Sequence, residues 1–172
     1  MLTVGTLAAA ALGTVYALLC YYNPIIYMTF VGAIFFGLGM GFAIQYGVRI
    51  GKVRNPKVVF GVSLILALLS LYFCWVAYIS LLINNAEDLE GWVVIFDPLA
   101  LWNIIQVMAA NGVWEIRGAT PTGSALYTVW VIEALLISGA AILWGACFDS
   151  PFCEDCNRWT KSKDLDAKIP LE

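Results

Sequence analysis

Histidine is absent from this chain of 172 residues. Its absence removes the commonest proton shuttle and the commonest transition-metal ligand among protein side chains. It also excludes a nucleophile that is activated within a Ser-His or Cys-His pair. The ordinary histidine-dependent hydrolases and metalloenzymes are therefore excluded as functional classes.

Charge is scarce as well: 12% of the residues are charged and 62% are hydrophobic, with a mean hydropathy of +0.85. Soluble domains carry about 25% charged residues, so this chain has too little charge to cover a surface in water. We therefore predict an integral membrane protein whose first partner is the lipid bilayer. The net charge of −3 and the pI near 4.8 argue against nucleic acid as a partner.

Four apolar stretches are long enough to cross a bilayer, which takes roughly 20 residues. Each should be a helix, because backbone groups in lipid must satisfy their own hydrogen bonds. The first stretch lacks the charged n-region of a signal peptide, so we expect it to be retained. We predict an all-α fold: a single four-helix transmembrane domain in residues 1–150, followed by a cytoplasmic tail in residues 151–172. The predicted spans are residues 2–22, 25–48, 58–83 and 125–148.

Basic residues are confined almost entirely to two short segments, which predicts the threading. Cytoplasmic loops carry an excess of Lys and Arg, so both segments should be cytoplasmic. With four spans, both termini are then cytoplasmic, in a multi-pass protein of the cell membrane; we expect the inner membrane of a bacterium. The first segment holds Arg49, Lys52, Arg54 and Lys57, and the second holds Arg158, Lys161, Lys163 and Lys168.

The outer segment of residues 84–124 carries five acidic residues against one basic residue. Within it, Asp97-Pro98 is a helix start, with an acceptor at the N-cap and proline at the first helical position. Asn111-Gly112 is a matching stop. The helix between them, about residues 98–110, is too short to span and should lie in the outer interface. It serves either as a cap on the bundle or as a lid or docking surface.

The second span carries two rows of small residues at a spacing of four. Such rows let helix backbones approach closely in lipid. They indicate either packing within the chain's own bundle or an interface between copies of the chain. A third reading is that the glycine-rich stretch unwinds to bind a substrate. One row is Ala33, Gly37 and Gly41, and the other is Ala43, Gly47 and Gly51.

Glu133 is the one charged residue well inside a predicted span. Ionisable groups at such depth are costly and are functional candidates by default. No basic residue lies inside a predicted span, so its partners should be neutral polar groups such as Gln45. Glu133 is therefore either a neutral group that bonds helices together, or a proton or cation site in a transport path.

The tail contains a CxxC pair, Cys153 and Cys156, with Cys147 six residues before it. Structural disulfides are rare in the reducing cytoplasm, so the pair indicates half a zinc site, a redox pair or two inert thiols. Zinc takes four ligands. Cys147, a carboxylate or the CxxC of a second chain would have to complete the site, and a dimer would then be clipped together by its tails.

Four spans with a CxxC are similar in outline to the membrane disulfide-bond oxidases and the vitamin K epoxide reductase-like proteins. The resemblance covers the helix count and the pair Cys153 and Cys156. Those families present cysteines to the oxidising side and use a second, relay pair. The outer segments of this chain contain no cysteine, so their activity is not carried over.

Packing chemistry is abundant in this sequence and catalytic chemistry is sparse. We therefore expect a non-enzymatic scaffold or accessory protein that self-associates or binds another membrane protein. One alternative is a proton- or cation-coupled transport or channel protein that uses Glu133. A further alternative is a membrane thiol oxidoreductase that uses Cys153 and Cys156.

Overall fold

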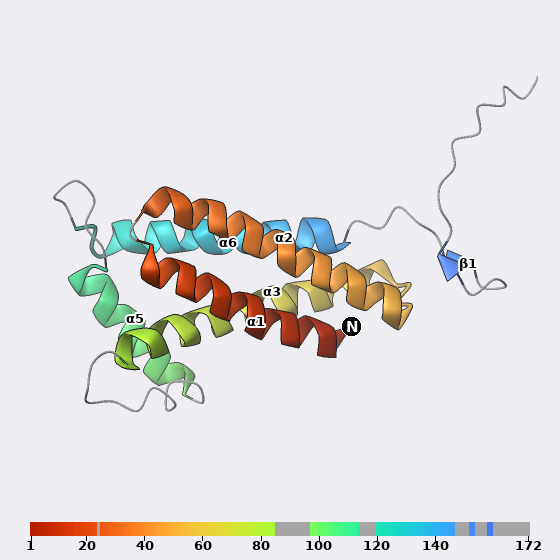
Figure 1. Ribbon diagram of the computed structural model, residues 1–172, viewed down its shortest axis with the longest axis horizontal. Coiled ribbons are helices and arrows are strands. Elements are labelled where there is room, and N and C mark those ends of the chain that lie inside the picture. The colour runs from red at the N-terminus through yellow and green to blue at the C-terminus, as the bar shows by residue number, and fades with distance from the viewer. Residues whose placement is uncertain (24, 85–96, 114–119, 147–151, 154–157, 160–172) are drawn as a thin grey trace, which may run out of the picture.

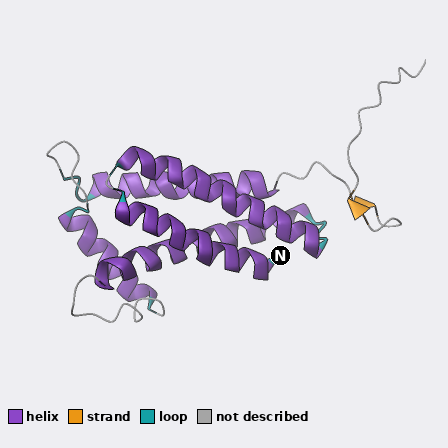
Figure 2. Cartoon of the chain, viewed as in Figure 1, coloured by secondary structure: helices purple, strands orange, loops and turns teal. Residues whose placement is uncertain are grey.

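The computed structural model describes residues 1–23, 25–84, 97–113, 120–146, 152–153 and 158–159. These residues form five helices and one small hairpin (Figures 1 and 2). In chain order they are α1 (Leu2–Tyr22), α2 (Ile26–Gly51), α3 (Pro56–Asn84), α5 (Pro98–Asn111), α6 (Ser124–Ala146), β1 (Phe152–Cys153) and β2 (Arg158–Trp159). Helices α1, α2, α3 and α6 are long and apolar enough to cross a membrane. The predicted all-α, four-span fold with a short extra helix is confirmed.

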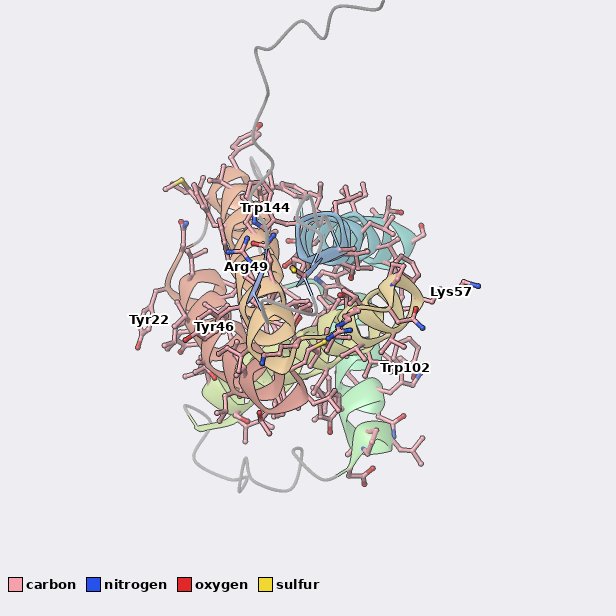
Figure 3. All side chains as sticks on the ribbon, turned by 90° about the vertical axis from the view of Figure 1, so that its right-hand side faces the viewer. Tyr22, Tyr46, Arg49, Lys57, Trp102 and Trp144 are labelled. Atoms are coloured by element: carbon pink, nitrogen blue, oxygen red, sulfur yellow. The ribbon has the colours of Figure 1, made fainter. Side chains whose placement is uncertain are left out.

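The four long helices pack side by side as a ring in the order α1, α3, α6, α2. One end of the bundle, the basic end, holds the start of α1, the loop between α2 and α3, and the end of α6 (Figure 1). Figure 3 looks onto this end, where Arg49 and Lys57 lie. The opposite end, the aromatic end, holds the turn between α1 and α2 together with α5. The side of the membrane that each end faces stays a prediction.

Local hydrogen bonds set the helix boundaries near the two tight connections. At the aromatic end, the backbone N–H of Ile25 donates to Asn23 Oδ1 at 3.1 Å. At the basic end, α2 stops at Lys52, whose φ of 49° is left-handed. The Asn55 side chain then accepts from Lys57 N at 3.0 Å and starts α3. Both helices run two or three residues further into this loop than their hydropathy predicts, because a helix can continue past the end of its apolar run.

Helix α5 begins and ends where the sequence predicts. Asp97 Oδ1 accepts from Leu99 N at 2.9 Å and from Ala100 N at 3.1 Å. Gly112 follows the last turn with φ 80°. One face of α5 packs on α3 and α6, while the polar face is exposed. The buried residues are Leu101, Ile105 and Ala109, and the exposed polar ones are Asn103 and Gln106.

The first row of small residues on α2 faces α6. A Cβ added at Gly37 would lie 2.6 Å from the carbonyl oxygen of Ile137, and one at Gly41 would lie 2.7 Å from Trp144 Cβ. Ala33, in the same row, is fully buried. Helix α2 is continuous through this stretch, so the structure gives no support to the alternative of a locally unwound segment. Packing within the chain accounts for this row.

The second row, which starts at Ala43, runs toward the start of α1. A Cβ at Gly47 would lie 3.0 Å from Met1 Cα, and one at Gly51 would lie 3.4 Å from Val53 Cγ2. The close approach of Met1 to Gly47 seats the beginning of α1 on α2. A contact within the chain therefore accounts for Gly47, while Ala43 is half-buried and Gly51 is exposed.

The tail contains a feature that the sequence reading missed. Strands β1 and β2 pair antiparallel, with Cys153 opposite Arg158. The sequence after Cys153 continues with Glu154 and Asp155, and acidic residues between short apolar stretches are a sequence signal that could have predicted paired strands. Cys147 and Cys156 lie outside the described residues, so the predicted zinc or redox role of the CxxC stays a prediction.

Candidate functional site

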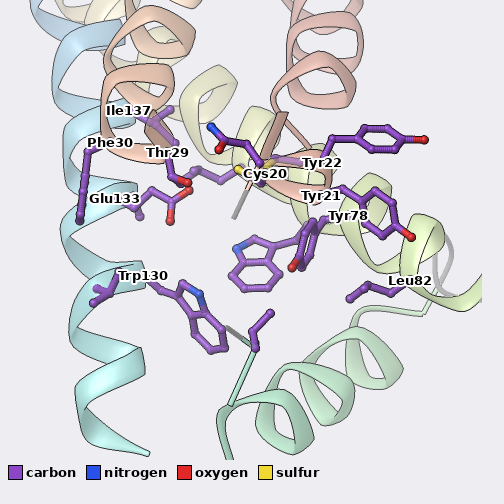
Figure 4. Close-up of a pocket in the computed structure, with 17 residues that line it drawn as sticks. Cys20, Tyr21, Tyr22, Thr29, Phe30, Tyr78, Leu82, Trp130, Glu133 and Ile137 are labelled. Carbon is purple, nitrogen blue, oxygen red and sulfur yellow. The ribbon is translucent and has the colours of Figure 1, made fainter. Parts of the chain in front are cut away.

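A cavity of about 660 Å³ lies at the aromatic end of the bundle. Its wall is built by the end of α1, the start of α2, the second half of α3 and the first two thirds of α6. Tyr22, the last residue of α1, and Asn23, the residue after it, also line the cavity, so it reaches the end of the bundle. Figure 4 shows Glu133 and Trp130 pointing from α6 into this space, opposite Cys20 and Tyr78. All four predicted spans thus converge on one site.

Glu133 supplies the cavity's acidic group. It lies nine residues into α6, which is about 14 Å along the helix axis. Its Oε1 accepts a hydrogen bond from the hydroxyl of Tyr16. Tyr16 is 3% exposed and Glu133 is half-buried, so the bond lies at the boundary between the packed core and the cavity. The structure therefore places the one intramembrane charge of the sequence in a cavity rather than against lipid.

The Tyr16 hydroxyl has a second acceptor, the backbone carbonyl oxygen of Thr29 at 3.2 Å. A phenol carries a single proton, so it donates to one acceptor at a time. Donation to Glu133 suits a charged carboxylate. Donation to Thr29 leaves the phenol oxygen to accept from Glu133, which requires a protonated carboxyl group. Rotation of one hydroxyl therefore accommodates both protonation states.

Packing holds the Tyr16 ring in place between α1 and α2. The ring stacks on Phe36, with centroids 5.1 Å apart and an interplanar angle of 21°. On α2, Gly32 leaves room for it, since a Cβ there would lie 3.2 Å from Tyr16 Cε2. Three helices thus determine one hydrogen bond. Helix α1 supplies the phenol and α6 supplies the carboxyl group. Helix α2 supplies the surface on which the ring packs and the second acceptor.

Aromatic side chains form much of the remaining wall. Trp75 of α3 and Trp130 of α6 meet edge to face, with centroids 4.9 Å apart and planes at 88°. Tyr78 packs edge to face on Trp75, and Tyr127 does so on Trp130. Edge-to-face pairs are favourable arrangements of the ring quadrupoles. This cluster continues into the buried face of α5, so α5 supports the wall from outside.

Two thiols line the same cavity. Cys20 of α1 and Cys74 of α3 both appear in its wall, although the sequence indicates only two apolar residues buried in their helices. Neither residue is in a disulfide. Tyr16 was missed as well, because it is 117 positions from its partner. No local pattern links residues at such a separation.

The other sequence-predicted polar residue, Gln45, lies elsewhere. It is 16 residues beyond Thr29 on α2, which is about 24 Å toward the basic end, and it does not line the cavity. The buried hydroxyls of Ser63 and Ser70 donate to carbonyl oxygens of their own helix, Val59 at 2.7 Å and Ala67 at 2.8 Å. Glu133 therefore draws its partner from α1 rather than from these residues.

Among the described residues, no three carboxylates or thiols gather closely enough to hold a metal ion. Comparison with protein-family models, with curated proteins and with solved structures finds no match for this chain. The function must therefore be argued from the cavity and its carboxyl group.

Proposed function

We propose that this protein is a transporter that couples a small ligand in the aromatic-end cavity to a proton on Glu133. The observation that carries the proposal is the site of that carboxyl group: it lines a cavity that all four spans share. Its hydrogen-bond partner, Tyr16, also has the alternative acceptor Thr29. A carboxyl group that can be satisfied both charged and neutral is suited to exchange a proton for a ligand.

The packed core between the cavity and the basic end supports the interpretation that the cavity is open toward one end of the bundle only. Toward the basic end, the bundle is closed by fully buried side chains, including Met40, Ile44 and Leu66. The cavity reaches the opposite end at Tyr22 and Asn23. Such an arrangement is what alternating access requires of a state that is open to one side only.

The scaffold hypothesis has less support, because the residues that motivated it have contacts within the chain. Gly37 and Gly41 pack closely against α6, and Gly47 packs against Met1. The exposed apolar residues of α6, such as Leu135 and Leu143, are suitable for contact with lipid and do not by themselves call for a protein partner. Self-association or binding of another membrane protein stays a prediction.

The test uses purified protein in liposomes that contain a pH-sensitive dye. Three ligands are added in turn from outside: an organic cation (ethidium), a short-chain quinone as the neutral ligand, and an organic anion. We expect one of these classes to trigger an internal pH change that empty liposomes do not show. Glu133→Gln should abolish the change, because the amide keeps the size of the side chain but cannot exchange a proton.

Ser138→Ala is the matched control. It removes a polar group from the same helix at a position that does not line the cavity, so its response should equal that of the parent. The proposal fails if none of the three ligand classes triggers a pH change, or if Glu133→Gln responds like the parent.

A further inference from the structure

We infer that the cavity binds a lipophilic organic cation with aromatic or alkyl substituents, such as a hydrophobic amine or a quaternary onium ion. This inference rests on the proposed function and names its ligand class. The determinants are the carboxyl group of Glu133 and the ring cluster of Trp75, Tyr78 and Trp130. Each feature of the cavity that distinguishes cations from anions and neutral molecules points the same way.

Charge is the first such feature. Among the described residues that line the cavity, none is basic, and Glu133 is the acidic one. An anion would meet no counter-charge and would be repelled by the carboxylate.

The aromatic wall is the second feature. Indole and phenol rings attract a cation through the negative faces of their π-systems, most strongly where water is excluded. Trp75, Tyr78 and Trp130 are held in edge-to-face pairs, so their orientation is established before a ligand arrives. Glu133 is one helical turn from Trp130 on α6, so the two lie on the same face of the helix. The carboxylate and the rings can therefore contact one ligand together.

Size is the third feature. A volume of about 660 Å³ lies within the range of pockets that enclose drug-sized ligands. A metal cation or a simple ammonium ion would leave most of that space unfilled. The mostly apolar walls would also offer such an ion few oxygen ligands. A cation that carries apolar substituents fills the volume and buries its own apolar surface against Leu71, Leu82 and Ile137.

Competition with a proton follows from this geometry. A proton and an organic cation neutralise the same Glu133 carboxylate, so affinity should fall as pH falls, by up to about tenfold per pH unit wherever that carboxyl group is protonated in the free protein. The titratable groups that face Glu133 are Tyr16 and Cys20 from α1, and Cys74 and Tyr78 from α3. Phenols and thiols are ordinarily neutral below about pH 8. Any dependence of the affinity on pH below about pH 8 would therefore report the carboxyl group.

The experiment is a calorimetric titration of the purified full chain in mild detergent. Tetraphenylphosphonium is the probe, and tetraphenylborate is a control of the same shape and opposite charge. We expect saturable binding of the phosphonium ion, tighter at higher pH, and none of the borate. Glu133→Gln should weaken binding at least about tenfold and remove its pH dependence, since the charge pair is lost. Trp75→Leu should weaken it about 3- to 30-fold, while Trp75→Phe keeps a ring and most of the affinity.

Trp144→Leu is the control for loss of a tryptophan, because Trp144 packs on Phe42 of α2 and does not line the cavity. Equal binding of borate and phosphonium would overturn the inference, as would a pH dependence that persists in Glu133→Gln. Binding of a quinone alone would overturn the cation class but leave the proposed function intact, provided that the quinone triggers a Glu133-dependent pH change in liposomes. Loss of binding in both Trp75 variants, with retained helicity, would assign Trp75 to packing and contradict its role as a cation contact.

Discussion

Replacement of Gly37 by alanine tests whether the small residues of α2 hold this bundle together. An added Cβ would lie 2.6 Å from the carbonyl oxygen of Ile137 and 2.7 Å from Ala140 Cβ. The first of these atoms belongs to the backbone of α6 and cannot rotate away. Helices α2 and α6 would have to separate by several tenths of an ångström along their shared face. That face includes the buried Ala33 and Ala141.

The magnitude follows from two opposing effects. Overpacking a tight contact costs about 1–3 kcal/mol, while alanine in place of glycine favours a helix by about 1 kcal/mol. Gly139→Ala is the matched control, because it gains the same propensity on α6 and an added Cβ meets nothing within 4 Å. The two variants should therefore differ by about 1–3 kcal/mol. On the unfolding entropy of globular proteins of this size, that difference lowers the midpoint by about 3–10 °C.

Intrinsic tryptophan fluorescence during thermal unfolding in mild detergent is the assay, since the chain contains seven tryptophans. The oligomeric state is measured by light scattering at several protein concentrations. We expect Gly37→Ala to unfold earlier than Gly139→Ala at every concentration. Gly37→Ala should destabilise the Ala140→Gly variant less than it destabilises the parent, because Ala140→Gly removes the contact with Cβ but leaves the contact with the Ile137 carbonyl.

Two results would refute this reasoning. If Gly37→Ala is as stable as Gly139→Ala, the close approach of α2 to α6 is not a determinant of stability. If instead Gly37→Ala lowers only the proportion of oligomer and leaves the monomer's midpoint unchanged, the row of Ala33, Gly37 and Gly41 acts between chains rather than within one.

Two further predictions concern hydrogen bonds of single side chains. Tyr16→Phe keeps the stacking on Phe36 but removes the hydroxyl that bonds Glu133. It should lower stability by about 1–3 kcal/mol and shift the infrared C=O stretch of the protonated carboxyl group to higher wavenumber; an unchanged band would contradict the contact. Asp97→Ala removes the acceptor for the backbone N–H groups of Leu99 and Ala100. Hydrogen exchange at the start of α5 should accelerate by the amount that corresponds to a loss of about 0.5–2 kcal/mol of local stability. Exchange in α1 should be unchanged and serves as the control. Equal exchange rates in variant and parent would show that the cap does not stabilise α5.

The helices could be predicted from the sequence because their signals are local. A run of apolar residues about 20 long needs no partner to be a span, since lipid itself forces the backbone to bond internally. The start of α5 at Asp97-Pro98 is also local, because the acceptor and the donors that it satisfies lie within three residues. The end of α2 was less well predicted, since hydropathy falls at Val48 whereas the backbone continues as a helix to Gly51.

The candidate site was predictable in one residue. Glu133 was identified from the sequence because a charge in an apolar run is conspicuous wherever it points. Its setting was not predictable, because it depends on which helices are neighbours in the ring. Tyr16, Cys20, Cys74 and Trp75 are ordinary residues in apolar runs, and nothing in their own segments distinguishes them.

By itself, then, the sequence determined that this is a multi-span helical membrane protein with a short extra helix and one costly internal carboxyl group. Those properties follow from hydrophobicity, chain length and capping, which act between residues close in the chain. The tertiary structure decided that the carboxyl group faces a shared cavity, that Tyr16 bonds it from 117 positions away, and that Gly37 and Gly41 of α2 pack against α6 and Gly47 against Met1. These arrangements depend on how helix surfaces fit together, which no single helix encodes.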